Sequence, residues 1–288
     1  MGATARTPGA LRTRLLGAVG AVRTRLLGAA GTLRTRLLGV VGVLAAFAVC
    51  EVLGRAGPVR SAYLPPASEV LVRAVRLGGD PAFLRGVRAT LEAWAAGLAL
   101  ACAVAVPLGL LLGSVPAVNE AVRVLVELVR PVPSVALIPL VSLLLGSGFA
   151  TTVALVAFAS VWPVLFNTVY GLGETDPLAE ETLRAFGFGR LSVLLRAALP
   201  SAAPVIAAGV RISAATALIL AVATEILAGF GEGLGIFIAQ AGTATDGTRD
   251  VLAAVVWAGL LGLLINGALL AAERRLFPWT PEHRRDVA

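Results

Sequence analysis

The sequence predicts an all-α membrane protein with six transmembrane helices. Hydrophobic residues make up 58% of the 288 residues and charged residues only 14%. The mean hydropathy is +0.89, which lies outside the usual range of soluble proteins. Several apolar runs reach the roughly 20 residues that cross a bilayer. Unpaired backbone groups in lipid cost several kcal/mol each, so such spans are expected to be helices.

Six apolar runs have the length of a span. They cover about 37–54, 89–113, 124–146, 150–172, 202–228 and 251–272. All 24 basic residues are arginines; with the N-terminus inside, fifteen lie on the cytoplasmic side, seven outside and two within spans. Cytoplasmic loops carry the excess of positive charge in membrane proteins, so this bias predicts that both termini lie inside. The bias is imperfect, because the first external connection carries six arginines.

The chain is expected to have four parts. An N-terminal cytoplasmic extension is followed by the first span with its external connection, by a core of five spans and by a cytoplasmic tail. Their bounds are 1–36, 37–88, 89–276 and 277–288. The external connection contains a proline pair, Pro65-Pro66, after which the sequence predicts a short amphipathic helix.

The N-terminal extension contains an internal repeat of eleven residues. The motif Arg-Thr-Arg-Leu-Leu-Gly follows Leu11, Val22 and Leu33. Eleven residues make almost three helical turns, so a basic helix lying on the inner membrane surface is one interpretation. Each unit also has two glycines, which cost about 1 kcal/mol each in a helix. A tail without a specific role is the other interpretation.

The longest cytoplasmic loop is the polar segment 181–200, between two long apolar runs. Asp176, which precedes a proline, is a plausible helix start, and Gly187 is a plausible break. Gly189 then opens a second helix, which Pro200 is expected to end.

The loop has a Glu, then a Gly six residues later, and a Leu-Pro pair thirteen residues after that Gly. This spacing resembles the "EAA" loop of ABC-transporter importer permeases. The resemblance implies a type I importer permease fold, in which the loop lies in a cleft of the ATPase subunit and transmits the motion of ATP hydrolysis. In the family, the two residues that follow this Glu are small, and here they are Thr182 and Leu183. The alternative interpretation of the segment is an ordinary amphipathic loop at the membrane interface. The coupling residues so implied are Glu181, Thr182, Leu183, Gly187, Leu199 and Pro200.

A second segment, RPVPSVALIPLVSLLLGSG from Arg130, looks like the matching stretch of nitrate, sulfonate and taurine importer permeases. The resemblance implies a small anionic or zwitterionic solute. It also implies a second permease copy, two ATPase copies and an external solute-binding protein as partners in the bacterial inner membrane. The charge of Arg130 is costly within a span unless it faces a partner or a wet cavity, so this residue is a candidate for the pathway.

Glu225 and Arg211 are ionisable residues within the fifth span. Such groups should face the bundle interior, pair with another group or mark a pathway. Glu225 is expected near the outer mouth and is followed by Gly233-Leu-Gly235, as in related permeases. Arg211 lies fourteen residues earlier, about 21 Å along the helix axis, so the two cannot pair directly. Both are candidates for the pathway or a gate, with structural pairing or snorkelling as the alternative.

Signals of catalysis are missing from the sequence. It has no phosphate-binding loop, no paired metal ligands and no nucleophile with a base, so we expect neither an enzyme nor a bound cofactor. ATP would be used by a separate ATPase subunit. A secondary transporter driven by an ion gradient is the alternative, and it would favour inverted repeats. The net charge of +7 is attributed to orientation and anionic membrane lipid rather than to nucleic acid.

Overall fold

The structure, a computed structural model, describes residues 38–56, 64–114, 133–228, 231–245 and 247–279. The N-terminal repeat, Arg130 and the first part of the expected third span lie outside these residues. The described chain is α-helical with short 3-10 and π segments, as expected. It divides into two compact units, Met1–Ser68 and Glu69–Ala288. The four-part division expected from the sequence stays a prediction.

The first unit contains the helix Leu38–Ala56, which has the length and hydropathy of a membrane span. Near the end of this helix, the Glu51 carboxylate accepts hydrogen bonds from the backbone N–H of Ser68 at 2.9 Å and from its hydroxyl at 3.0 Å. Arg55 Nε donates to the same carboxylate at 2.5 Å. These bonds fix the outer end of the first span to the residues that follow the proline pair.

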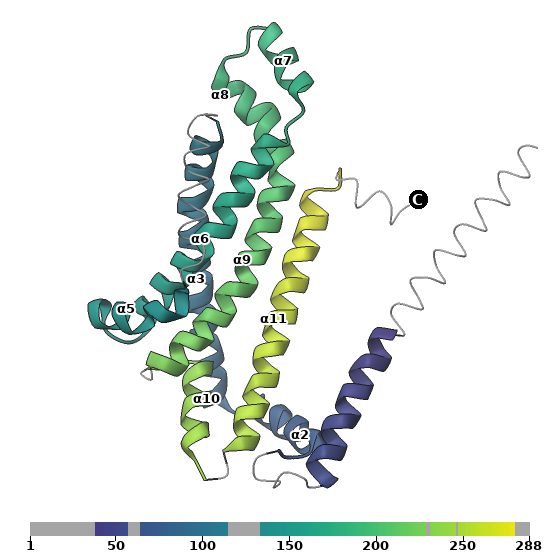
Figure 1. The fold of residues 1–288 in the computed structure, drawn as a ribbon, viewed down its shortest axis with the longest axis vertical. Coiled ribbons are helices and arrows are strands. Elements are labelled where there is room, and N and C mark those ends of the chain that lie inside the picture. Colours follow the sequence, from purple (N-terminus) through teal and green to yellow (C-terminus); the bar gives the residue numbers. More distant parts are fainter. Residues whose placement is uncertain (1–37, 57–63, 115–132, 229–230, 246, 280–288) are drawn as a thin grey trace, which may run out of the picture. The chain divides into compact units, whose positions relative to one another are not determined.

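The second unit holds the remaining helices (Figure 1). They are α2 (Ala67–Leu77), α3 (Pro81–Gly113), η1 (Ser134–Leu137), α5 (Ile138–Leu145), α6 (Phe149–Gly173), α7 (Pro177–Ala185), α8 (Arg190–Val193), η2 (Leu194–Ala198), α9 (Leu199–Ala228), α10 (Leu234–Thr243) and α11 (Thr248–Leu276). The α2 helix is the amphipathic helix that the sequence predicts after the proline pair.

Five of the expected spans are confirmed, because five described helices are long and apolar enough to cross a membrane. Of the expected span 124–146, the structure describes only the part after Pro133, where η1 and α5 form a short apolar helix. The second span is longer than expected and begins at Pro81 instead of 89. The Asp80 carboxylate accepts a hydrogen bond from the N–H of Ala82 at 2.9 Å, and this cap starts the helix eight residues earlier.

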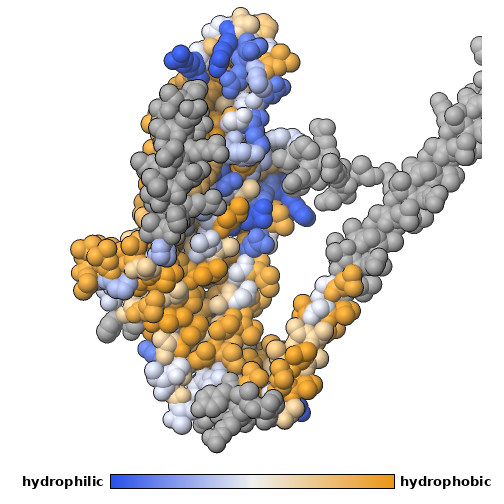
Figure 2. Space-filling model, viewed as in Figure 1, coloured by the Kyte–Doolittle hydropathy of each residue, from blue (hydrophilic) through white to orange (hydrophobic). Residues whose placement is uncertain are grey.

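The two ends of the second unit differ in character. Helices α7 and α8 form one end. The other end holds α2, the C-terminus of α10 and the N-terminus of α11 (Figure 1). Hydrophobic side chains cover the middle of the visible face and hydrophilic ones gather over the α7–α8 end (Figure 2). This distribution fits a bilayer around the middle and water at the α7–α8 end.

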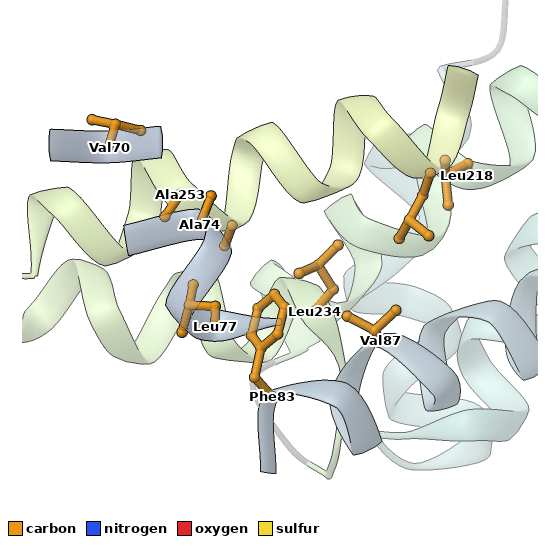
Figure 3. Packing of buried hydrophobic residues seen from close by; sticks show 10 residues of the cluster. Val70, Ala74, Leu77, Phe83, Val87, Leu218, Leu234 and Ala253 are labelled. Atoms are coloured by element: carbon orange, nitrogen blue, oxygen red, sulfur yellow. The ribbon is translucent and has the colours of Figure 1, made fainter. Parts of the chain in front are cut away.

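A buried cluster joins α2, α3, α9, α10 and α11 at the end opposite α7 (Figure 3). The Phe83 ring packs edge-on against Phe237, with the ring centroids 5.0 Å apart. Trp257 Nε1 donates to the backbone carbonyl of Ala74 at 2.9 Å, which attaches α11 to α2. Arg73 also pairs with Asp250, and this hydrogen bond raises the pKa of the Arg73 guanidinium.

Small side chains fill the interfaces among α3, α6 and α9. Lipid supplies no hydrophobic drive between helices, so close packing of small residues holds them together. The alanines that are fully buried in these helices are Ala101, Ala105, Ala202, Ala214, Ala217 and Ala221. The α7–α8 end connects α6 to α9 of this bundle.

Candidate functional site

The α7–α8 end is built by local signals in the sequence. The carboxylate of Asp176 accepts a hydrogen bond from the N–H of Leu178 at 2.9 Å and caps α7, with Pro177 at the first helical position. Gly187 has φ +83, the left-handed conformation that stops a helix. Gly189 then caps α8 in an extended conformation. The predicted helix, break and helix are confirmed.

The turn between the two helices is closed by hydrogen bonds and a ring contact. The N–H groups of Gly187 and Phe188 donate to the carbonyls of Arg184 and Leu183 at 2.9 and 3.1 Å. The Arg196 guanidinium lies over the Phe188 ring, 4.9 Å from its centroid. Contacts of this kind attach the turn to the second helix of the loop.

The expectation that Pro200 ends the second helix is wrong. Residues Arg190–Ala228 form one continuous helix of 39 residues. A π-helical segment, Leu194–Ala198, ends two residues before the proline. A change of this kind in the hydrogen-bond register lets a helix accept a residue that has no N–H to donate. The second helix of the loop therefore continues into the membrane span without a break.

The α7–α8 end carries four exposed large apolar side chains. Their exposed fractions are 68% for Leu178, 78% for Phe186, 68% for Leu191 and 52% for Leu195. Beside them, a groove of about 750 Å³ runs between α7 and the start of α9, and the Trp279 side chain lines its far edge. Large apolar side chains that are exposed on a polar surface are typical of contact sites for other proteins.

Three of the six coupling residues that the sequence predicts line this groove, and the coupling role of the six stays a prediction. Glu181 and Thr182 lie exposed on α7, and the Thr182 hydroxyl donates to the carbonyl of Leu178 at 2.7 Å. Leu183 and Pro200 line the groove. The exposed apolar tip was missed in the sequence, because an apolar residue in a short amphipathic helix is expected to face the bundle. The signal in the sequence was the recurrence of large apolar residues within the polar loop. In the structure, α7 has no buried side chain, so its apolar residues do not face the bundle.

Glu225 is buried, with 6% of its surface exposed, at the opposite end of α9. Its Oε2 accepts hydrogen bonds from the Thr90 hydroxyl and from the N–H of Gly235, both at 2.8 Å. The Thr90 oxygen in turn accepts a bond from the N–H of Leu234 at 2.8 Å. The first amides of α10 are therefore held by side chains of α9 and α3, and a helix N-terminus favours such a negative charge.

Close approach of backbone explains the glycines after Glu225. A Cβ added to Gly235 would meet the backbone carbonyl of Val222, and it would lie 2.7 Å from Glu225 Cβ. The sequence pointed to Gly233-Leu-Gly235, and the structure brings these residues against the Glu225 side chain. Thr90 was missed, because a threonine in an apolar span gives no sign of a partner 135 residues away.

Arg211 does not meet Glu225 but pairs with Glu273 of α11, at 2.9 Å between Nε and Oε1. Both side chains are partly buried. Glu273 was also missed, since it stands in the sequence next to two exposed arginines at the end of α11. Whether Arg211 serves the pathway stays a prediction, as it does for Arg130 outside the described residues.

We expect Arg211→Met to lower the stability of the folded chain, because Glu273 would keep a partly buried charge without a partner. The cost should be about 1–3 kcal/mol. The double variant Arg211→Glu with Glu273→Arg should recover part of the loss. Thermal unfolding of the purified proteins measures both effects. Equal stability of wild type and Arg211→Met would show that the pair contributes nothing.

Residues 105–278 match the family of binding-protein-dependent transport system inner membrane components. The chain belongs to this family. It is 30% identical over 76% of its length to the taurine transport system permease of Escherichia coli, covering 81% of that protein. It is 32% identical over 75% to the formylaminopyrimidine transport permease of Halalkalibacterium halodurans, covering 85%. The nitrate import permease of Leptolyngbya laminosa is 26% identical over 70%, with 71% covered.

The fold is that of importer permeases in solved structures. A chain of the MetNI methionine ABC transporter in an inward-facing conformation superposes with a TM-score of 0.58 at 20% identity. The match covers 67% of this chain and 94% of that one. The family match and the relatives show that the protein is a multi-pass inner-membrane permease of an ABC importer and not an enzyme. The ion-driven secondary transporter, which was the alternative, is set aside. Permeases of this family act with an ATPase and a binding protein.

Proposed function

We propose that the α7–α8 end of this permease is the docking surface for its ATPase subunit, and that the chain conducts a small anionic or zwitterionic solute. The observation that carries the docking is the exposed apolar tip formed by Leu178, Phe186, Leu191 and Leu195. In this proposal the ATPase subunit hydrolyses ATP, and the permease forms the translocation pathway for the solute.

The continuous helix from Arg190 to Ala228 supports a mechanical role for the docking surface. A movement of the ATPase that displaces α8 would be carried along one continuous helix into the membrane. Because the helix ends beside Glu225, the displacement would reach the bonds between α9, α3 and α10. Discrete rearrangement of packed helices is how such a displacement becomes a change of state.

The solute class is supported by the names of the relatives. These transport taurine, nitrate and formylaminopyrimidine, which are small polar compounds. Two copies of this chain, two copies of the ATPase and an external binding protein complete the assembly that we propose. Glu225, Arg211 and Arg130 remain the candidates for the pathway or its gates.

Co-purification with the ATPase tests the docking surface. We expect Phe186→Asp to reduce the ATPase recovered with the tagged permease at least tenfold, because a charge buried in an apolar contact is desolvated without a partner. Phe186→Leu keeps an apolar side chain of similar reach and is the matched control, with recovery near wild type. Membrane abundance of each variant is measured alongside. Full recovery of the ATPase with Phe186→Asp would place the docking surface elsewhere.

A further inference from the structure

A second groove, of about 590 Å³, lies between α9 and α11, which pack side by side (Figure 1). It is lined along α9 from Arg211 to Ile226, a length of about 22 Å at 1.5 Å per residue. One leaflet of a bilayer core is about 15 Å thick. Arg211 and Asn266 are the only polar side chains among the described residues that line the groove. The groove therefore has the length and the apolar walls that suit a lipid acyl chain.

The inner end of this groove, which is the end nearer to α7, presents hydrogen-bond donors. Arg211 Nε donates to Glu273 in the last turn of α11 at 2.9 Å, and Asn266 lies about two turns before Glu273 on the same helix. The two terminal nitrogens of Arg211 have no hydrogen-bond partner among the described residues, and neither has the Asn266 side chain. Leaving such groups unpaired in hydrocarbon costs free energy, so an acceptor is expected here.

The inner end also carries a surplus of positive charge. Arg274 and Arg275 follow Glu273 in the last turn of α11, and both are exposed. Neither has an ion-pair partner in the part of the chain that the structure describes, whereas Glu273 is already paired with Arg211. Basic pockets between transmembrane helices on the cytoplasmic side bind the headgroups of anionic lipids. The charge at this end therefore favours an anionic occupant.

The chemistry of the inner end distinguishes a lipid from a transmembrane helix. The first span, Leu38–Ala56 of this chain or of a second copy, is the helix that could fill an apolar groove, since few of its side chains are buried. It has no carboxylate, amide or hydroxyl before Glu51, and Glu51 is already bonded to Arg55 and Ser68. A phospholipid has phosphate oxygens, which a guanidinium binds through two parallel bonds, and ester carbonyls, which accept from an amide. A lipid therefore supplies the acceptors that this helix lacks.

We propose that the groove between α9 and α11 binds one anionic phospholipid of the inner leaflet. Its phosphate accepts hydrogen bonds from the terminal nitrogens of Arg211, and one acyl chain lies along the groove toward Ile226. Asn266 donates to an ester carbonyl near the start of that chain, and the arginines at the end of α11 attract the negative headgroup. The inference goes beyond the proposed transport function and does not depend on which solute is carried.

Lipid added to the full-length permease in detergent tests the proposal. Dioleoylphosphatidylglycerol is the probe, with dioleoylphosphatidylcholine at the same mole fraction and sodium phosphate at the same concentration as comparisons. A ligand that binds only the folded protein raises its melting temperature with increasing concentration. We expect phosphatidylglycerol to raise the melting temperature by several degrees more than either comparison, and native mass spectrometry to show it retained on the chain. Equal shifts with the two lipids would overturn the anionic assignment, and an equal shift with sodium phosphate would overturn the role of the acyl chain.

Gly259→Leu fills the groove, and Gly267→Leu is its matched control. Both glycines lie on α11 and a Cβ at either meets nothing within 4 Å, but only Gly259 lines the groove. Leucine favours a helix over glycine, so neither variant should weaken the helix. We expect Gly259→Leu to retain at least fivefold less phosphatidylglycerol than wild type, and Gly267→Leu to retain as much as wild type.

Two further variants test the polar end of the groove. Asn266→Leu removes the amide, and the double variant Arg211→Met with Glu273→Met removes the guanidinium without leaving Glu273 as an unpaired charge. Each should lower the retention of phosphatidylglycerol severalfold.

Unchanged retention of phosphatidylglycerol in Gly259→Leu would overturn the proposal. If that variant does not fold, unchanged retention in both variants of the polar end would overturn it as well. The oligomeric state in lipid-free detergent is measured for the two glycine variants. A dimer that is lost in Gly259→Leu but kept in Gly267→Leu would assign the groove to a helix of a second copy and would also overturn the lipid assignment.

Discussion

Gly187→Val should abolish solute uptake while the chain still inserts into the membrane. Gly187 has φ +83, and a β-branched residue is strongly disfavoured there, at a cost of about 1–2 kcal/mol. The nine residues of α7 include no buried side chain that could hold the helix in place against that cost. The turn is therefore expected to change, and the four exposed apolar side chains would no longer form one docking surface.

The comparison with Gly189→Val isolates the backbone effect. Gly189 has φ −70 and ψ 165, which any residue adopts, and a Cβ at either glycine meets nothing within 4 Å. Uptake is measured in proteoliposomes with the ATPase and binding protein, beside membrane abundance and ATPase recovery. We expect Gly189→Val to transport nearly as well as wild type. Normal uptake and ATPase recovery with Gly187→Val would contradict the docking proposal.

Gly235→Ala should reduce the yield and thermal stability of the folded permease. The added methyl group would meet the backbone carbonyl of Val222, which cannot move unless α9 moves. Overpacking of this kind costs about 1–3 kcal/mol. Separation of α10 from α9 would also lengthen the hydrogen bond from the Gly235 N–H to Glu225, which is 2.8 Å in the wild type. Detergent-solubilised yield and the melting temperature are the measurements.

Gly242→Ala is the matched control on the same helix. The nearest atom to a Cβ there, Val251 Cγ2, is 3.9 Å away, an ordinary van der Waals contact. Alanine also favours a helix over glycine by about 1 kcal/mol, so this variant should be as stable as wild type or more stable. Equal stability of Gly235→Ala and Gly242→Ala would show that α9 and α10 are not in tight contact.

Features that depend on near neighbours in the chain could be predicted. The Asp176 cap, the Gly187 turn and the start of α8 each follow from the conformational preference of one or two residues. The apolar runs predict spans because backbone groups must pair within the helix in lipid. The predicted helix boundaries were less accurate, since the Asp80 cap starts α3 at Pro81 instead of residue 89.

Composition and local pattern were enough to predict a multi-span helical membrane protein with a polar loop that contains a helix, a break and the start of a second helix. The folded chain places Pro200 within a continuous helix, where the π segment before it changes the hydrogen-bond register. It also decided that Arg211 pairs with Glu273 and that Glu225 holds the start of α10 with Thr90. Local preferences are properties of short segments, whereas the partner of a buried charge is set by helices that pack together from distant parts of the chain.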